Sequence, residues 1–213
     1  MKSTEALVLL GTVVLCLALS SISPFDRTTW LLEIFPVLIV IGVLAASYTR
    51  FPLTPILYRL IFLHSLILIV GGYYTYARVP VGAWMQSLFD LQRNHFDRLG
   101  HFAQGFVPAV AAREILLRVT PLRTGKMLFF IVLCICLAIS AFYEFIEWWA
   151  ALIMGQAADD FLGTQGDPWD TQWDMFMAFI GAITAQLVLS RVHDREIASV
   201  GTGRNTSREP YAA

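Results

Sequence analysis

Long runs of apolar residues, separated by short polar connections, follow one another along this chain. Six of these runs come close to the about 20 residues that a helix needs to cross a bilayer, and they occupy residues 6–22, 30–49, 56–77, 98–118, 126–150 and 172–191. The connections contain prolines, whose missing backbone N–H does least harm there: Pro24, Pro52, Pro55, Pro80 and Pro121. The pattern predicts an all-α, polytopic membrane protein with about six transmembrane helices.

The fourth run is more polar than the others, because it contains His101, Gln104, Arg113 and Glu114 and directly follows Asp97. We keep it as a transmembrane helix because, without it, the last two helices would be inverted. The basic connection at 123–126 and the tail would then lie on opposite sides of the membrane. A helix this polar must bury its polar face against neighbouring helices or a water-filled cavity.

The composition also indicates a membrane protein with a single domain. Of the 213 residues, 57% are hydrophobic and 15% are charged, whereas soluble domains carry about 25% charged residues. We expect one transmembrane domain at 1–195 and a polar cytoplasmic tail at 196–213. The first run resembles a signal peptide, but it is long and another span follows it, so a retained helix is expected. The net charge of −1 argues against a nucleic-acid partner.

The basic residues are distributed unevenly between the two sides of the predicted bundle. With the N-terminus inside, only four of the 15 lysines and arginines fall on the outer side, Arg27, Arg78, Arg93 and Arg98, which leaves 11 on the inner side. Because basic connections are retained in the cytoplasm, we expect both termini to be cytoplasmic and the protein to lie in a bacterial inner membrane.

Carboxylates gather between the fifth and sixth runs, on the side that this orientation places outside. The stretch from Tyr143 to Asp174 holds seven of them: Glu144, Glu147, Asp159, Asp160, Asp167, Asp170 and Asp174. Charged groups at membrane depth are costly, so an acidic cluster there is a functional-site hypothesis by default. For a single residue a structural role is the simpler explanation, and Asp170 has the position of a helix cap.

Helical spacing places the polar residues of the last three runs in three stripes, each at the outer end of its helix. The stripes are Asp97, His101, Gln104 and Pro108 on the fourth run, Ser140, Tyr143, Glu144 and Glu147 on the fifth, and Asp170 and Asp174 on the sixth. Consecutive helices with short connections are usually neighbours. We therefore expect the three stripes to converge on one pocket.

A pocket with so many carboxylates cannot keep all of them ionised in a low dielectric, unless Arg93, Arg98 or a divalent metal offsets their charge. One histidine among carboxylates suits Mg²⁺, Mn²⁺, Zn²⁺ or Fe²⁺. The predicted metal ligands are His101, Glu144, Glu147, Asp170 and Asp174. Catalytic roles, including that of a general base, are predicted for His101, Glu144, Glu147 and Asp174. The residues predicted to contact the substrate or the metal ligands are Asp97, Arg98, Gln104, Tyr143, Asp159, Asp160 and Asp167.

Several long segments of the chain resemble the YjdF-type family of uncharacterised bacterial inner-membrane proteins. They are GGYYTYARVP, DRLGHFAQGFVPAVAAREILLR, SAFYEFIEWWAAL and ADDFLGTQGDPWDTQWDMFMAFIGA. Together they span about the C-terminal two-thirds of the chain. That family carries no established activity, so the resemblance implies a fold and a location only.

A more distant similarity links the same three stripes to VanZ-like membrane proteins. Their Asp-Lys and His-Phe pairs are similar to Asp97-Arg98 and His101-Phe102, and their Glu-x-x-Gln is similar to Glu144 and Glu147. Their Asn-x-x-Gly-Ala pattern departs from this chain, which has Asp in place of Asn. The similarity implies a role in the cell envelope or on a lipid-linked molecule.

Three functions are compatible with these features. The first is a metal-dependent enzyme that acts on a lipid or cell-envelope precursor from the outer side. The second is a cation or proton-coupled transporter that uses the same carboxylates as a relay. The third is a membrane scaffold without catalytic activity, in which the charges fix helix packing.

Overall fold

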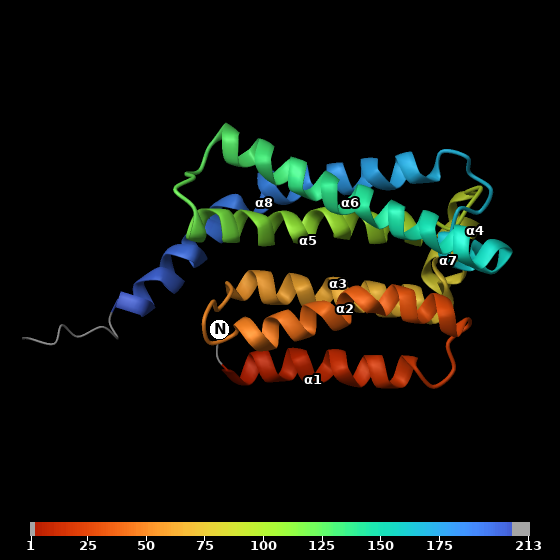
Figure 1. Cartoon of the computed structure of the whole chain (residues 1–213), viewed down its shortest axis with the longest axis horizontal. Coiled ribbons are helices and arrows are strands. Elements are labelled where there is room, and N and C mark those ends of the chain that lie inside the picture. Colours follow the sequence, from red (N-terminus) through yellow and green to blue (C-terminus); the bar gives the residue numbers. More distant parts are fainter. Residues whose placement is uncertain (1–2, 206–213) are drawn as a thin grey trace, which may run out of the picture.

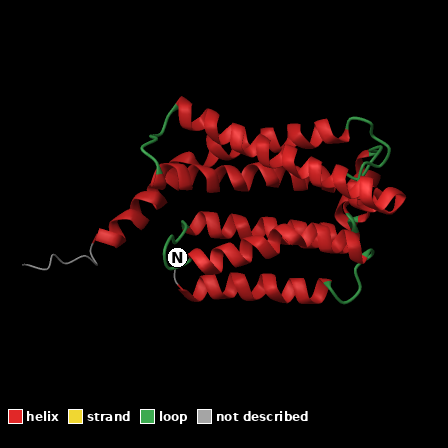
Figure 2. Cartoon of the chain, viewed as in Figure 1, coloured by secondary structure: helices red, strands yellow, loops and turns green. Residues whose placement is uncertain are grey.

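The computed structural model describes residues 3–205, and these form helices joined by short connections, with no strand in that range (Figure 2). Six helices are long: α1 (Ser3–Ser20), α2 (Arg27–Ser47), α3 (Pro55–Tyr74), α5 (Phe96–Val119), α6 (Lys126–Met154) and α8 (Asp170–Asn205). The short elements are η1 (Tyr76–Arg78), α4 (Pro80–Phe89), η2 (Gly155–Ala158) and α7 (Asp159–Leu162). The predicted all-α class and the six long helices are confirmed.

The long helices lie roughly side by side in two groups, with α1, α2 and α3 in one and α5, α6 and α8 in the other (Figure 1). The N-terminus and the free end of α8 lie at one end of the molecule, which we call the inner end. The short helices α4 and α7 lie at the opposite, outer end. The outer end is the one that the distribution of basic residues assigns to the outside of the membrane.

Local signals in the sequence explain where the helices begin and end. The carboxylate of Asp26 caps α2 by accepting a hydrogen bond of 2.7 Å from the backbone N–H of Thr29. Both α3 and α4 begin with a proline, which is favoured in the first turn because its N–H would have no partner there. The long helix α6 ends at Gly155, whose φ of +58° favours glycine.

In the described part of the chain, four helices are long and apolar enough to cross a membrane: α2, α3, α6 and residues Asp170–Val200 of α8, with mean hydropathies between 1.7 and 2.4. A shorter apolar helix covers Thr4–Ser20. Large apolar side chains project outward from these helices, among them Leu7, Phe35, Phe130 and Leu187. Such an exposed apolar surface is stable in lipid and not in water, so the chain is an integral membrane protein.

Helix α5 is the exception in hydropathy, and it lies inside the bundle. It contacts α3, α6 and α8. Four of its ionisable residues, Asp97, His101, Arg113 and Glu114, are buried, and Arg98 and Arg118 near its ends are partly buried. The expectation that this helix must bury its polar face is therefore confirmed.

The closest helix crossing joins α5 to α8 through glycine. A Cβ atom at Gly105 would lie 1.8 Å from the carbonyl oxygen of Ala178, and one at Gly181 would lie 2.1 Å from that of Phe102. Neither backbone could approach so closely with a side chain in between. The crossing fixes the distance between the two helices just inward of the acidic residues.

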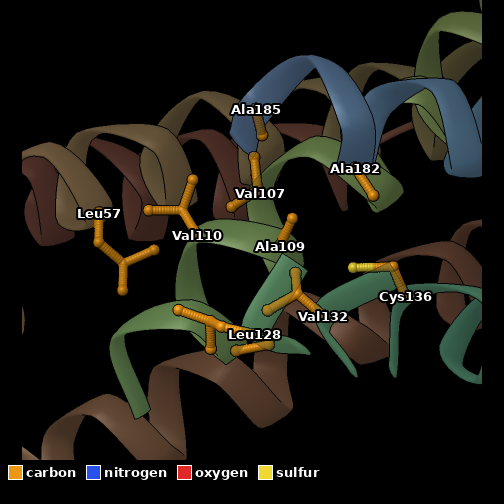
Figure 3. Close-up of a cluster of buried hydrophobic side chains, with 10 residues drawn as sticks. Leu57, Val107, Ala109, Val110, Leu128, Val132, Cys136, Ala182 and Ala185 are labelled. Carbon is orange, nitrogen blue, oxygen red and sulfur yellow. The ribbon is translucent and has the colours of Figure 1, made fainter. Parts of the chain in front are cut away.

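Below this crossing, α3, α5, α6 and α8 share an apolar core in the inner half of the bundle (Figure 3). Its side chains interdigitate from all four helices and include Leu57, Val110, Leu128, Val132 and Ala185. This core holds α3 against the α5–α6–α8 group.

A polar cluster lies at the inner end around the buried side chains of Glu114 and His193, and we call it the inner cluster. The carboxylate of Glu114 accepts hydrogen bonds from the backbone N–H and hydroxyl of Thr54, from Arg118 at 2.6 Å and from His193 at 3.0 Å. Arg113 extends the cluster to Asp194 on α8, at 2.6 Å. The cluster connects α5 to α8 and to the start of α3.

Two elements differ from the expectations drawn from the sequence. Helix α8 continues to Asn205, well beyond residue 191, because His193, Asp194 and Glu196 form hydrogen bonds with α5 and with the first turn of α3. The short helix α4 has only ten residues and presents Val81, Trp84 and Leu88 at its surface. Crossing a bilayer takes about 20 helical residues, so α4 is too short to span it.

Candidate functional site

The buried imidazole of His101 lies at the centre of a group of carboxylates at the outer end of the bundle. Its Nε2 is 3.6 Å from Asp97 Oδ1 and 3.9 Å from Asp174 Oδ2, and its Nδ1 is 4.0 Å from Glu144 Oε1. These residues come from α5, α6 and α8, so the structure brings together the three stripes that helical spacing places on the last three spans. We call this group the acidic site.

Two overlapping sets of side chains in the acidic site have the spacing of metal ligands. One consists of Asp97, His101 and Asp174, and the other of His101, Glu144 and Glu147. Within each set, one potential ligand atom per residue lies within 4.8 Å of the others. Four of the five predicted ligands thus fall in these sets, and Asp97, expected only to contact substrate or the ligands, joins them.

Three carboxylate oxygens of the acidic site are buried and have no hydrogen-bond partner among the described residues. They are Asp97 Oδ2, Glu144 Oε1 and Asp174 Oδ1. A buried polar atom without a partner is unfavourable by about 1–3 kcal/mol. A cation, a proton or a polar ligand beside the imidazole would give these three oxygens a partner.

The fifth predicted ligand, Asp170, lies beside the acidic site and forms an ion pair with Arg93. Arg93 also lies 3.5 Å from Asp97 and 3.4 Å from Asp167. It thereby links the connection before α5 to the start of α8. The role of Asp170 as a metal ligand stays a prediction, and its observed partner is an arginine.

Arg98 and Asp167 form a second ion pair at the edge of the site, at 2.9 Å. The guanidinium of Arg98 also lies 5.0 Å from the centre of the Trp173 ring. The other oxygen of Asp167 accepts a hydrogen bond from the backbone N–H of Trp169 just before α8 begins. Asp167 therefore caps this turn as well as holding Arg98.

The connection between α6 and α8 covers the outer end of the site. Ala158 and Phe161 are buried, and Gly163 lies so close that a Cβ there would be 3.7 Å from Asp97 Oδ2. The predicted contributions of Asp159 and Asp160 lie outside the described side chains. The connection is held in place by Gln165, whose amide exchanges two hydrogen bonds of 2.9 Å with the backbone of Asn94.

Gln104 and Tyr143 both contact the imidazole of His101. Gln104 Oε1 lies 2.9 Å from His101 Nδ1 and orients the ring, while the Tyr143 ring packs edge-on against the imidazole. The hydroxyl of Tyr143 donates a hydrogen bond of 3.2 Å to Glu33, a buried carboxylate on α2. Arg93 was expected to offset the charge of the pocket, and Glu33 was not among the predicted metal-ligating, catalytic or substrate-contacting residues.

Inward of the acidic site lies a cavity of about 320 Å³ between α2, α3, α5 and α6. Its outer part is lined by polar residues, including Glu33, His101 and Glu147, and its inner part by apolar ones such as Val40, Ile61 and Val107. The cavity therefore has a polar outer end and an apolar inner end. A ligand that fits it needs the same two-part character.

Positive charge falls short of negative charge in this part of the molecule. The carboxylates are Glu33, Asp97, Glu144, Glu147, Asp167, Asp170 and Asp174, and the two arginines are Arg93 and Arg98. Carboxylates this close cannot all be ionised without further cations. A bound divalent cation or several bound protons must supply the difference.

Comparison with known proteins gives two matches of high coverage. A family model described as "Predicted membrane protein (DUF2238)" matches residues 5–195. The chain is also 58% identical over 190 residues to "Inner membrane protein YjdF" from Escherichia coli (strain K12), which covers 89% of this chain and 91% of that protein. No solved structure matches the chain.

Proposed function

We propose that this chain, which belongs to the DUF2238 family of membrane proteins and lies in the inner membrane, is a metal-dependent membrane enzyme. In this proposal the enzyme acts, from the outer side, on a lipid or a cell-envelope precursor. The observation that carries it is the group of carboxylates around His101, at the polar end of an otherwise apolar cavity. Three of their buried oxygens have no hydrogen-bond partner among the described residues.

The donor set suits a divalent metal. An imidazole with two or three carboxylates favours Zn²⁺, Mn²⁺ or Fe²⁺, and Mg²⁺ fits if the carboxylates dominate. His101 would hold the ion with Asp97 and Asp174, or with Glu144 and Glu147. Such an ion supplies Lewis-acid chemistry, by polarising a phosphoryl or carbonyl oxygen or by acidifying a water. The carboxylates outside the set used would accept a proton from the attacking group.

The cavity supports an amphipathic substrate rather than a free ion or a soluble metabolite. Its apolar part lies between helices that face the lipid, so an alkyl chain could enter from the bilayer with little cost. Arg98 is at the edge of the acidic site and only partly buried, and it is placed to meet an anionic headgroup. The VanZ-like similarity, which stays a prediction, points to the same class of molecule.

Metal analysis of the purified protein tests the proposal directly. We expect the wild type to retain a divalent metal through purification, and His101→Ala and Glu144→Gln to lose it. Loss of a residue that hydrogen-bonds to a metal ligand weakens metal affinity about 10–100-fold. Loss of the ligand itself should therefore weaken the affinity by more. Lipid mass spectrometry of cells carrying each variant then identifies the molecule that accumulates.

Matched controls exist for both substitutions. His95→Ala removes a histidine just before α5 that belongs to neither ligand set, and Glu5→Gln removes an exposed carboxylate on α1. Both should retain metal at the wild-type level. A wild-type protein without metal, whose cellular lipids are unchanged by His101→Ala, would contradict the proposal.

A transporter is the second candidate, and one observation favours it. Ionisable groups occur at three depths in the bundle: the acidic site, His64 at mid-depth and the inner cluster. If protons or cations pass between them, proteoliposomes should show a flux that Glu147→Gln lowers at least tenfold. A flux that Glu147→Gln leaves unchanged would exclude the acidic site as its path. A scaffold is indicated if neither metal nor flux is found and one partner copurifies.

A further inference from the structure

His64 is an ionisable residue in the middle of α3, far from either end of the bundle. It lines the cavity that opens from the acidic site, and its Nε2 is buried without a hydrogen-bond partner in the described part of the chain. The next residue, Ser65, donates its own hydroxyl to the carbonyl of Ile61 at 2.8 Å. The imidazole therefore needs a partner that the protein does not provide, and a ligand in the cavity could be that partner.

The depth of His64 on α3 relative to His101 on α5 follows from the ring of Tyr76, which contacts both helices. Tyr76 packs against Gly71 of α3 and Gly100 of α5, which places these two glycines at the same level. His64 lies seven residues inward of Gly71, and His101 one residue inward of Gly100. At a rise of about 1.5 Å per residue, His64 is about 9 Å deeper in the bundle than His101.

The wall of the cavity becomes apolar around and beyond His64. Val40, Ile61 and Ser65 belong both to this cavity and to a second one of about 420 Å³ between α1, α2 and α3. The second cavity is lined almost entirely by apolar side chains, such as Leu10 and Leu44. The two cavities therefore adjoin at these residues, and their combined lining changes from the acidic site, past the imidazole of His64, to apolar side chains.

We propose that the two adjoining cavities bind an ester-linked glycerophospholipid, with its phosphate at the acidic site and an ester carbonyl hydrogen-bonded to His64. In such a lipid about six covalent bonds separate phosphorus from the ester oxygen, a reach of about 7 Å. A hydrogen bond of about 3 Å covers the remaining distance to the imidazole. A polyprenyl phosphate has no acceptor at this depth and would leave His64 unpartnered. The inference rests on the proposed function, because it identifies the substrate class of the same site.

A pair of lipids that differ only in the ester carbonyl tests this assignment. Binding of diacyl phosphatidic acid and of its dialkyl ether analogue is measured by native mass spectrometry on the detergent-purified full chain. One hydrogen bond corresponds to about a three- to tenfold preference for the ester lipid. We expect that preference in the wild type, none in His64→Leu and a partial one in His64→Gln, which keeps a donor.

The metal content of each variant separates this inference from the proposed function. His64→Leu should retain metal at the wild-type level, because His64 belongs to neither ligand set. An ester preference without any metal would leave the lipid assignment standing and overturn the enzyme. Equal binding of the ester and ether lipids would overturn the lipid assignment, as would stronger binding of a polyprenyl phosphate or an ester preference that persists in His64→Leu.

Discussion

Replacing Gly105 with alanine should lower the free energy of unfolding by about 3 kcal/mol, the upper end of the usual cost of overpacking. A Cβ at this position would lie 1.8 Å from the carbonyl oxygen of Ala178, and backbone atoms cannot move aside as a flexible side chain does. The two helices must separate instead. Since His101 and Asp174 each lie four residues before the contact, their separation should increase and metal retention should fall too.

Two other helical glycines provide controls for this substitution. A Cβ at Gly11 or at Gly42 would meet nothing within 4 Å. Alanine there should leave the stability unchanged or raise it, because glycine in a helix is less favourable than alanine by about 0.5–1 kcal/mol. Thermal unfolding in detergent compares the three variants. Equal melting temperatures for Gly105→Ala and Gly42→Ala would show that the α5–α8 crossing is looser than described.

Replacing Glu114 with alanine should lower the free energy of unfolding by about 3–5 kcal/mol, the cost of breaking a buried ion pair by removing one partner. Both carboxylate oxygens of Glu114 accept hydrogen bonds, from Thr54, Arg118 and His193. Without them, the positive charge of Arg118 lacks its carboxylate and His193 stays buried without this acceptor. Glu114→Gln should cost less, because one amide oxygen still accepts.

The exposed ion pair between Glu5 and Arg59 is the matched control for the inner cluster. Its length is 2.8 Å, similar to the contacts of Glu114, but the two side chains are 35% and 56% exposed. Exposed pairs contribute about 0–1 kcal/mol. Glu5→Ala should therefore hardly change the midpoint of denaturant unfolding. If Glu5→Ala and Glu114→Ala shift that midpoint equally, burial does not determine the strength of the inner cluster.

The features that the sequence predicted well depend on local patterns. Hydropathy runs locate five of the long helices, and the requirement for a consistent orientation retains α5 in spite of its charges. Helical spacing places Asp97 and His101 on one face, and Glu144 and Glu147 on another. Short connections between the last three spans make their outer ends neighbours. These arguments use only distances along the chain and the geometry of one helix.

The features that the sequence did not predict depend on contacts between distant segments. The pairing of Arg93 with Asp170 joins residues 77 positions apart, and hydropathy carries no information about it. Glu33 reaches the site from α2 through Tyr143, across 110 positions. The extension of α8 is stabilised by His193 and Glu196, whose partners lie on other helices. An alternation of polar and apolar residues cannot identify such partners.

The burial of α5 also has a consequence for how the protein is made. This helix carries Asp97, Arg98, Arg113, Glu114 and Arg118. Each charge opposes insertion, by about 2.5–3.5 kcal/mol at the centre of a helix and by less towards its ends. As a lone segment leaving the ribosome, α5 would not partition into lipid. It becomes a transmembrane helix only when α6 and α8, synthesised after it, supply its partners. We therefore expect biogenesis of this protein to have a late step, in which α5 enters the membrane only after α6 and α8 have been synthesised.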